Sequence, residues 1–240
     1  MRRTRLSLAF LLVPLLLSAQ AGPGQEALER ATDAFFDQSL QAVELRRLLE
    51  AGRKAFAGLV DPCLRDYWLA RVEYLSGFVE RGDKREKEAQ RRFQAGLALA
   101  ERASSCSGLA DAPRLQADLI AQLIPARGAL YAMSHGPRIR TLTERSLGLE
   151  PASAKARLTL ALYFLNAPAI AGGSDAEALR LLHELEGREG LERPDRFGVL
   201  TWLGLAYRGR KDPERARLYL QRAQEVYPGN TWVRELAASL

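Results

Sequence analysis

The side chains that could perform chemistry are few in this chain of 240 residues. Catalysis needs a nucleophile with a base, paired carboxylates in a pocket, or a metal cluster. The two histidines, His135 and His183, each lack a second His or a Cys at metal-ligand spacing. We therefore expect both to be packing or surface residues, and we expect no catalytic residues, no metal and no cofactor.

Gly172, Gly173 and Ser174 could direct backbone N–H groups at an anion, because a helix is predicted to begin directly after them. No lysine follows them, no strand precedes them, and Asp175 and Glu177 would repel a phosphate. A structural turn is therefore the favoured interpretation of this segment.

Cys63 and Cys106 are the two cysteines of the chain. Apolar residues at helical spacing predict helices over 63–81 and 84–103, joined by the short link at residues 82–83. An antiparallel hairpin returns the end of the second helix to the start of the first. We predict a disulfide between Cys63 and Cys106; the alternative is two separately buried thiols.

Residues 1–21 have the pattern of a secretory signal peptide. A basic start is followed by the apolar run Leu6 to Leu17 and then by Ala19, Gln20 and Ala21, so cleavage is predicted after Ala21. The apolar run is shorter than the ~20 residues that a membrane-spanning helix needs. We expect a periplasmic or secreted protein without a stable membrane span.

The charge pattern argues against a nucleic-acid partner. The formal net charge is +6, and removal of the three signal-peptide arginines leaves 32 basic against 29 acidic residues, or +3. Charges of both signs alternate along the chain, as on a solvated helix face, and no one-sided basic stripe with interleaved aromatics is present.

The composition, rich in Ala, Leu, Arg and Glu and 47% hydrophobic, predicts an all-α fold. We expect helical hairpins over 22–110 and helix-hairpin repeats over 111–240, in one continuous solenoid that ends in a capping helix. Three further expectations concern single elements: one long or two shorter helices over Gln25 to Leu59, a helix pair over Leu115 to Met133 and Gly136 to Leu149, and Trp232 covering the last apolar face.

The clearest repeat lies near the C-terminus, where small and large residues recur at fixed intervals. Its residues are Leu200, Leu203, Gly204, Tyr207, Ala216, Leu220, Ala223 and Pro228. They match the tetratricopeptide pattern except at its first position, where Leu replaces Trp. Residues 197–230 therefore resemble a tetratricopeptide repeat, which implies antiparallel helix hairpins that bind another protein.

The preceding repeat has the same intervals within each helix but a longer connection. Leu165 to Ala178 spans 13 positions, whereas Tyr207 to Ala216 spans nine. The extra segment is an enlarged hairpin loop, in which a proline ends the first helix and a capping box over 174–177 starts the second. Its apolar content predicts a partner-binding loop. One alternative is that drift alone has kept the extra residues, because lengthening a loop costs little closure entropy; the other is packing of the Ile onto the adjacent helices. The residues of this loop are Pro168, Ala169, Ile170, Gly172 and Gly173.

The signal peptide and the loop motif together resemble a group of bacterial exported tetratricopeptide-like proteins. The matching residues are Asn166, Pro168, Gly172, Gly173, Ala178 and Leu179. This group includes the periplasmic T component associated with TRAP transporters, which forms ring-like oligomers and docks a solute-binding protein. The resemblance implies an accessory transporter subunit whose partner is a solute-binding protein or a second copy of the chain.

A groove is the other surface that the resemblance implies, on the inner face of each first helix. Thr201, Leu205 and Arg208 take these positions here, where carboxylate-gripping grooves use Lys and Asn, so a mixed apolar and cationic groove is expected. A second candidate face is aromatic, although such a stripe is more typical of a core. Its residues are Tyr67, Trp68, Tyr74 and Phe78.

These patterns predict a non-catalytic, periplasmic protein–protein interaction scaffold. The second hypothesis is a small-ligand carrier, which a closed apolar pocket between helices would favour over an open concave face. An enzyme is the least favoured class.

Overall fold

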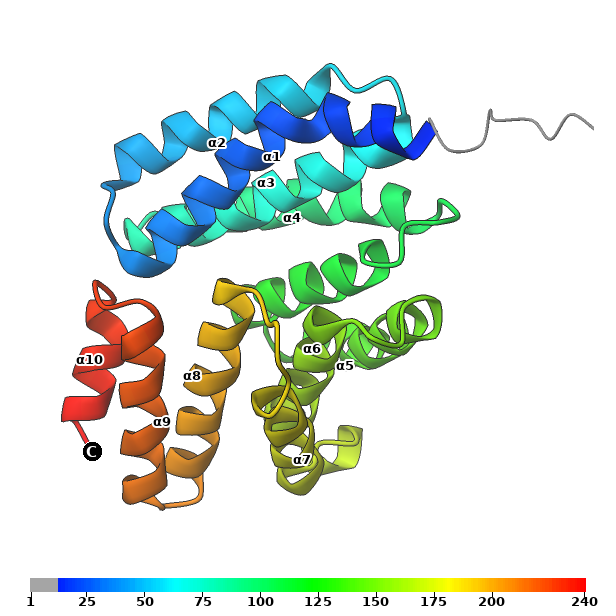
Figure 1. Cartoon of the computed structure of the whole chain (residues 1–240). Coiled ribbons are helices and arrows are strands. Elements are labelled where there is room, and N and C mark those ends of the chain that lie inside the picture. The colour runs from blue at the N-terminus through cyan, green and yellow to red at the C-terminus, as the bar shows by residue number, and fades with distance from the viewer. Residues whose placement is uncertain (1–12) are drawn as a thin grey trace, which may run out of the picture.

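The computed structural model describes residues 13–240, with side chains from residue 22 onward. The predicted signal peptide falls largely outside them, because residues 1–12 are not described and residues 13–21 are described only as backbone of the first helix. Within the described residues the chain is α-helical, which confirms the predicted fold class (Figure 1). Its elements are α1 Val13–Asp37, α2 Ala42–Ala57, α3 Pro62–Gly82, α4 Glu86–Ser104, α5 Ala112–Leu149, α6 Ala154–Asn166, the 3-10 turn η2 Ala169–Ala171, α7 Asp175–Glu186, α8 Arg193–Gly209, α9 Pro213–Val226 and α10 Thr231–Ala238.

Helices that are neighbours in the sequence pack as antiparallel hairpins: α1 with α2, α3 with α4, α6 with α7 and α8 with α9. In the α8–α9 pair, a Cβ atom added to Gly204 would lie 2.7 Å from Leu220 and 3.2 Å from the Ala216 carbonyl. Glycine at this position therefore sets how closely the two helices approach. The turn between them ends at Pro213, and α9 stops before Pro228, as the repeat pattern predicts.

Five of the helices begin at a side chain that accepts a hydrogen bond from an N–H group of the first turn. These residues are Asp61, Ser153, Ser174, Asp212 and Asn230. The caps satisfy N–H groups that have no partner inside the helix. They fix where each hairpin starts, and so fix the loops between the helices.

Two expectations about helix boundaries are resolved by the structure. Residues 25–59 form two helices, because the chain turns between Asp37 and Ala42. The pair expected over 115–133 and 136–149 divides instead at Gly128, where φ is 77°. Only glycine adopts this conformation without strain. Gly128 lies three residues after Pro125, which has no N–H to donate to the helix. The helix break therefore lies earlier than expected, and Pro137 lies inside the second half.

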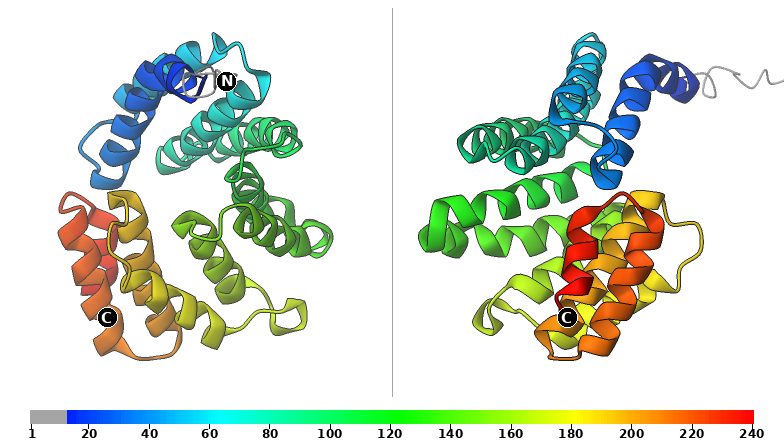
Figure 2. Two further views of the ribbon diagram at one scale, coloured as in Figure 1. Left: turned by 45° about the vertical axis from the view of Figure 1, so that its right-hand side comes forward. Right: turned by 90° about the vertical axis from the view of Figure 1, so that its left-hand side faces the viewer.

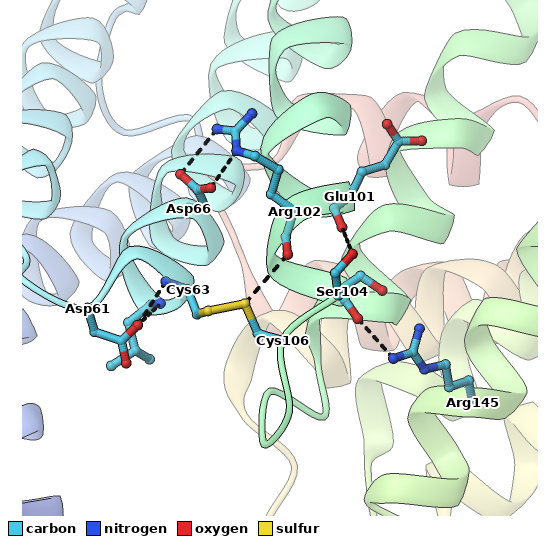
Figure 3. Close-up of a disulfide and its surroundings, with 10 residues drawn as sticks. Asp61, Cys63, Asp66, Glu101, Arg102, Ser104, Cys106 and Arg145 are labelled. Carbon is cyan, nitrogen blue, oxygen red and sulfur yellow. Dashed lines mark hydrogen bonds and ion pairs between the residues drawn. A yellow bond between two sulfur atoms is a disulfide. The ribbon is translucent and has the colours of Figure 1, made fainter.

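The disulfide between Cys63 and Cys106 joins the first turn of α3 to the chain just after α4, with the two Cα atoms 6.1 Å apart (Figure 3). Beside it, Arg102 donates to both carboxylate oxygens of Asp66, at 2.6 and 3.2 Å. Arg145 of α5 donates to the Ser104 carbonyl at 2.9 Å. The end of α4 is thus tied to α3 on one side and to α5 on the other.

The end of α1 closes the fold against the turn between α9 and α10, so that the N-terminal and C-terminal parts lie side by side (Figure 2). Asn230 donates to the Phe36 carbonyl at 2.6 Å, and the Gly229 N–H donates to Asp37 at 3.0 Å. The ring of Phe36 lies 5.3 Å from Phe197 and 5.6 Å from Tyr227 between centroids. We call this contact the α1 closure.

The predicted capping helix is present as α10, but its buried residue is not the expected one. Trp232 is 49% exposed, whereas its neighbour Val233 is fully buried in the C-terminal core. The reason is helical geometry, because adjacent residues on a helix point about 100° apart and only one of them can face α9. None of the helices in the described region combines the length and the apolar content that crossing a membrane requires.

The aromatic stripe of α3 belongs to the core. Tyr67, Tyr74 and Phe78 pack against the central cluster around Phe93, and Trp68 packs against the N-terminal cluster, where its ring stacks on Phe56 at 5.0 Å. The stripe is therefore a packing surface between α3 and its neighbours.

Candidate functional site

The loop between α6 and α7, residues 167–174, is the candidate partner-binding site. Ala167 has φ −77° and ψ 143°, the extended conformation favoured before a proline, and it ends α6. The 3-10 turn η2 follows, and Gly172 takes a left-handed conformation with φ 87°. Ser174 then caps α7 by accepting a hydrogen bond from the Glu177 N–H. Pro168, Gly172 and Ser174 therefore end α6, turn the chain and start α7, as the sequence predicts.

Hydrogen bonds brace this loop from both sides. The Tyr163 hydroxyl donates to the Ala171 carbonyl, and the Ser174 N–H donates to the Phe164 carbonyl at 2.8 Å. The Gly173 N–H donates to the Pro168 carbonyl at 3.0 Å, and a Cβ atom at Gly173 would collide with the Ala167 carbonyl. The loop is consequently a defined structure rather than a flexible tether.

The capping box expected over residues 174–177 is only half formed. Its first bond exists, from the Glu177 N–H to the Ser174 hydroxyl at 3.3 Å. The reciprocal bond is replaced, because the Ser174 N–H is taken by the Phe164 carbonyl and the Glu177 carboxylate pairs with Arg180 at 3.0 Å. Tertiary contact with α6 thus replaces one of the two local bonds.

The tip of the loop points into solvent. Ile170 is 100% exposed, and Pro168, Ala169 and Gly172 are also exposed. The alternative in which Ile170 packs onto the adjacent helix pair is therefore wrong. Among residues 22–240, Ile170 is the most exposed of the large apolar side chains, and the partner-binding interpretation of the loop stays a prediction.

The same geometry gives no support to anion binding at this loop. The Gly172 N–H donates to the Ala169 carbonyl at 3.0 Å, and the Gly173 N–H is used within the loop as well. Both donors are occupied, so the two glycines make a structural turn, as the acidic residues after them indicate.

The predicted groove residues lie on one face of α8, but they do not form one open surface. Thr201 is 4% exposed, Leu205 is half-buried and Arg208 is exposed. One turn before Thr201, the same face carries Phe197, which contacts Phe36 of the α1 closure. The expectation that Thr201 lines an accessible groove is therefore wrong, because this end of the face is packed.

The two histidines have packing partners. His183 contacts the Tyr207 hydroxyl through Nε2 at 2.9 Å and the Glu186 carboxylate through Nδ1 at 3.0 Å. The ring of His135 stacks on Tyr131 with 3.9 Å between centroids. Among residues 22–240, no group of three or more His, Cys, Asp or Glu side chains is arranged to hold a metal ion.

A polar pocket of about 290 Å³ lies where the N-terminal hairpins meet the repeats. Its walls come from four segments: α3, the residue before α5, the turn from α5 into the start of α6, and the turn from α7 into the start of α8. Its charged lining residues are Arg71, Asp111, Glu150, Lys155, Arg188, Glu192 and Asp195. Charged walls are the opposite of the closed apolar cavity that would favour the hypothesis of a small-ligand carrier. Reasoning from the sequence missed this pocket.

A buried charge network lies behind this pocket. Arg114 bonds Asp111 and Asp118, Tyr67 donates to Asp111 at 2.8 Å, and Thr159 donates to Asp118 at 2.8 Å. Burial alone would raise the pKa of Asp111, but the Arg114 guanidinium outweighs burial and lowers it. At Asp118 burial dominates and raises the pKa despite the same arginine. The network joins α3, α5 and α6.

The comparisons with known proteins are sparse. No protein-family model and no curated protein matches the chain. Among solved structures, the chain is similar to YrrB, described as a TPR protein with an unusual peptide-binding site, with 16% sequence identity and a TM-score of 0.41. The match covers 92% of this chain and 100% of that chain.

Proposed function

We propose that the chain is an exported, non-catalytic scaffold that binds another protein through the loop between α6 and α7. The observation that carries the proposal is Ile170, a large apolar side chain that is fully exposed at the tip of a loop braced by hydrogen bonds. The neighbouring hairpin turns from α8 to α9 without such an extension, so the helix pairs do not need it.

The energetics favour a contact at this tip. Burying one Ile side chain gains about 2–3 kcal/mol relative to leaving it in water. Because the loop is already fixed, little conformational entropy remains to be lost on binding. A contact of this size is equivalent to roughly 30-fold or more in affinity.

The test places a charge at the tip. Ile170→Asp should abolish or strongly weaken capture of the partner in an extract of the native cell, without changing the melting temperature. Val60→Asp is the matched control, because Val60 is 82% exposed in a different turn, between α2 and α3. A photo-crosslinking residue at position 170, but not at position 60, should trap the partner. Capture that survives Ile170→Asp refutes the loop as the binding site.

Export is the second part of the proposal. It rests on the signal-like N-terminus and on the Cys63–Cys106 disulfide, since disulfides persist in oxidising compartments. Mass spectrometry of the protein isolated from its native cell should find Gly22 as the first residue. An intact N-terminus on protein recovered from membranes would contradict this part.

The finer form of the proposal is an accessory subunit of a solute transporter. It is supported by the loop motif from Pro168 to Gly173, and its partner would be a solute-binding protein or a second copy of the chain. Light scattering of the purified protein detects self-association, and affinity purification against solute-binding proteins of the same cell detects the other partner. If the protein is a monomer and captures no solute-binding protein, the transporter role is refuted, but the scaffold proposal remains intact.

A further inference from the structure

The polar pocket is held open by contacts between the two turns that form its rim. Arg188, from the turn between α7 and α8, donates to the Ala152 carbonyl of the turn between α5 and α6. Lys155, at the start of α6, pairs with Glu192 at 2.7 Å across the same gap. These two contacts tie the two rim segments to each other, so the pocket is a built feature rather than a chance gap between loops.

Arg71 is the cation of this pocket that has no carboxylate of its own. Among residues 22–240 no acidic side chain lies within ion-pair distance of it, although every other cation of the lining is bonded to a carboxylate or a carbonyl. The Asp111 carboxylate lines the same pocket and the charge of Arg71 helps to lower its pKa, but Asp111 forms its ion pair with Arg114. Its guanidinium lies 4.8 Å from the Trp68 ring centroid and 5.9 Å from that of Tyr67. Stacking on these rings holds the guanidinium in place and leaves its N–H groups available to an anion.

Asp195 is a carboxylate of the pocket whose negative charge is only partly balanced by a neighbouring cation. Its side chain is only 13% exposed, and its ion pair with Lys155 is long, at 3.4 Å, because the same ammonium lies closer to Glu192. Burial raises the pKa of Asp195, and Lys155 only partly opposes this shift. An additional ammonium group in the pocket would compensate this carboxylate.

From these contacts we propose that the pocket binds a small zwitterion, with its carboxylate on Arg71 and its ammonium on Asp195. A pocket of about 290 Å³ lies just below the usual range for the sites of drug-sized ligands, so only a small ligand fits it. This size and this charge pair fit the class of free amino acids and dipeptides. The site does not involve the α6–α7 loop, so it is independent of the proposed scaffold function.

The test is isothermal titration of the full protein with L-alanine and with alanyl-alanine, beside propionate and propylamine, which carry one charge each. At least one zwitterion should bind, and more tightly than either single-charge probe. Arg71→Gln should weaken zwitterion binding at least about tenfold, because it removes a bidentate charge-assisted contact. Asp195→Asn, which keeps the size of the side chain, should weaken it similarly. Arg65→Gln, on the same helix but outside the pocket, is the matched control and should have no effect.

Several results would overturn the proposal. One is the absence of heat from both zwitterions up to about 10 mM, well above the concentration for a weak millimolar site. Another is equal affinity in the wild type and in Arg71→Gln or Asp195→Asn. If Arg71→Gln fails to fold, the affinity of Asp195→Asn for the zwitterion alone decides the proposal. Circular dichroism verifies that this variant is folded. Ile170→Asp should bind the zwitterion like the wild type, which separates this test from that of the scaffold.

Discussion

Removing the disulfide should destabilise the protein by an amount that follows from the loop it closes. The perturbation is the double variant Cys63→Ser and Cys106→Ser, and both positions are half-buried, so serine fits each without a cavity. The cross-link closes a loop with a sequence separation of 43 residues. In the chain-entropy model, such a loop restricts the unfolded chain by ~4 kcal/mol at 25 °C. For a protein of this size, that loss corresponds to a fall of roughly 8–16 °C in the melting temperature.

The assay is urea unfolding followed by far-ultraviolet circular dichroism, with the wild type in oxidised and reduced form beside the double variant. Thiol labelling of the unreduced, unfolded wild type should find no free thiol. Arg102→Gln is a useful control, since it removes the neighbouring ion pair with Asp66 and a long bond to the Ala98 carbonyl. The Asp66 side chain is 13% exposed but that of Arg102 is 58% exposed, so solvent screens the pair and it contributes ~1 kcal/mol. A loss below ~1 kcal/mol in the double variant would refute the loop-entropy reasoning and assign the stability of this hairpin to packing between α3 and α4.

Three further predictions test other contacts. Gly204→Ala should destabilise the protein by ~1–3 kcal/mol in urea unfolding, because the added methyl group meets Leu220, whereas Gly209→Ala, with open space around it, should not. Glu80→Gln should destabilise the folded protein at pH 7. The hydrogen bond from Arg46 lowers the Glu80 pKa from 4.5, so the ionised carboxylate stabilises the fold above pH 4.5. This stabilisation is lost as the pH falls through the folded-state pKa of Glu80. The difference in unfolding free energy between wild type and variant should therefore shrink in acid. Asn230→Ala should cost ~1–3 kcal/mol and increase hydrogen exchange in α1, since it removes both a helix cap and the bond to Phe36.

Local features of the fold could be predicted from the sequence. The α8–α9 hairpin follows from small and large residues at fixed intervals, and the loop at 167–174 follows from a proline and two glycines whose backbone preferences are strong. These signals act within about 35 residues of chain, and the structure places them as expected. The backbone preferences of proline and glycine and the spacing of small and large residues are enough to predict these two features.

Long-range features could not be predicted in the same way. The packing of Phe197, one turn before Thr201 on α8, depends on α1, whose Phe36 reaches it from more than 150 residues away. The polar pocket depends on charged residues from four separate segments, each of which resembles an ordinary solvated position in the sequence. The break at Gly128 is not evident from the sequence because the later Gly136 and Pro137 offer a competing signal.

The α1 closure has a consequence for how the chain acquires its structure during synthesis. An open array of repeats can nucleate anywhere and extend one unit at a time. Here the hydrogen bond that joins Asn230 to Phe36 spans 194 residues, so the last turn of α1 must wait for almost the whole chain to be made. Until then, Phe36 has no Tyr227 to pack on, and the first hairpin is left with apolar surface open to aggregation or to a chaperone. A nascent chain that ends before Tyr227 lacks both Tyr227 and Asn230, so Phe36 stays uncovered and the α1 closure cannot form until residues 227–230 have been made.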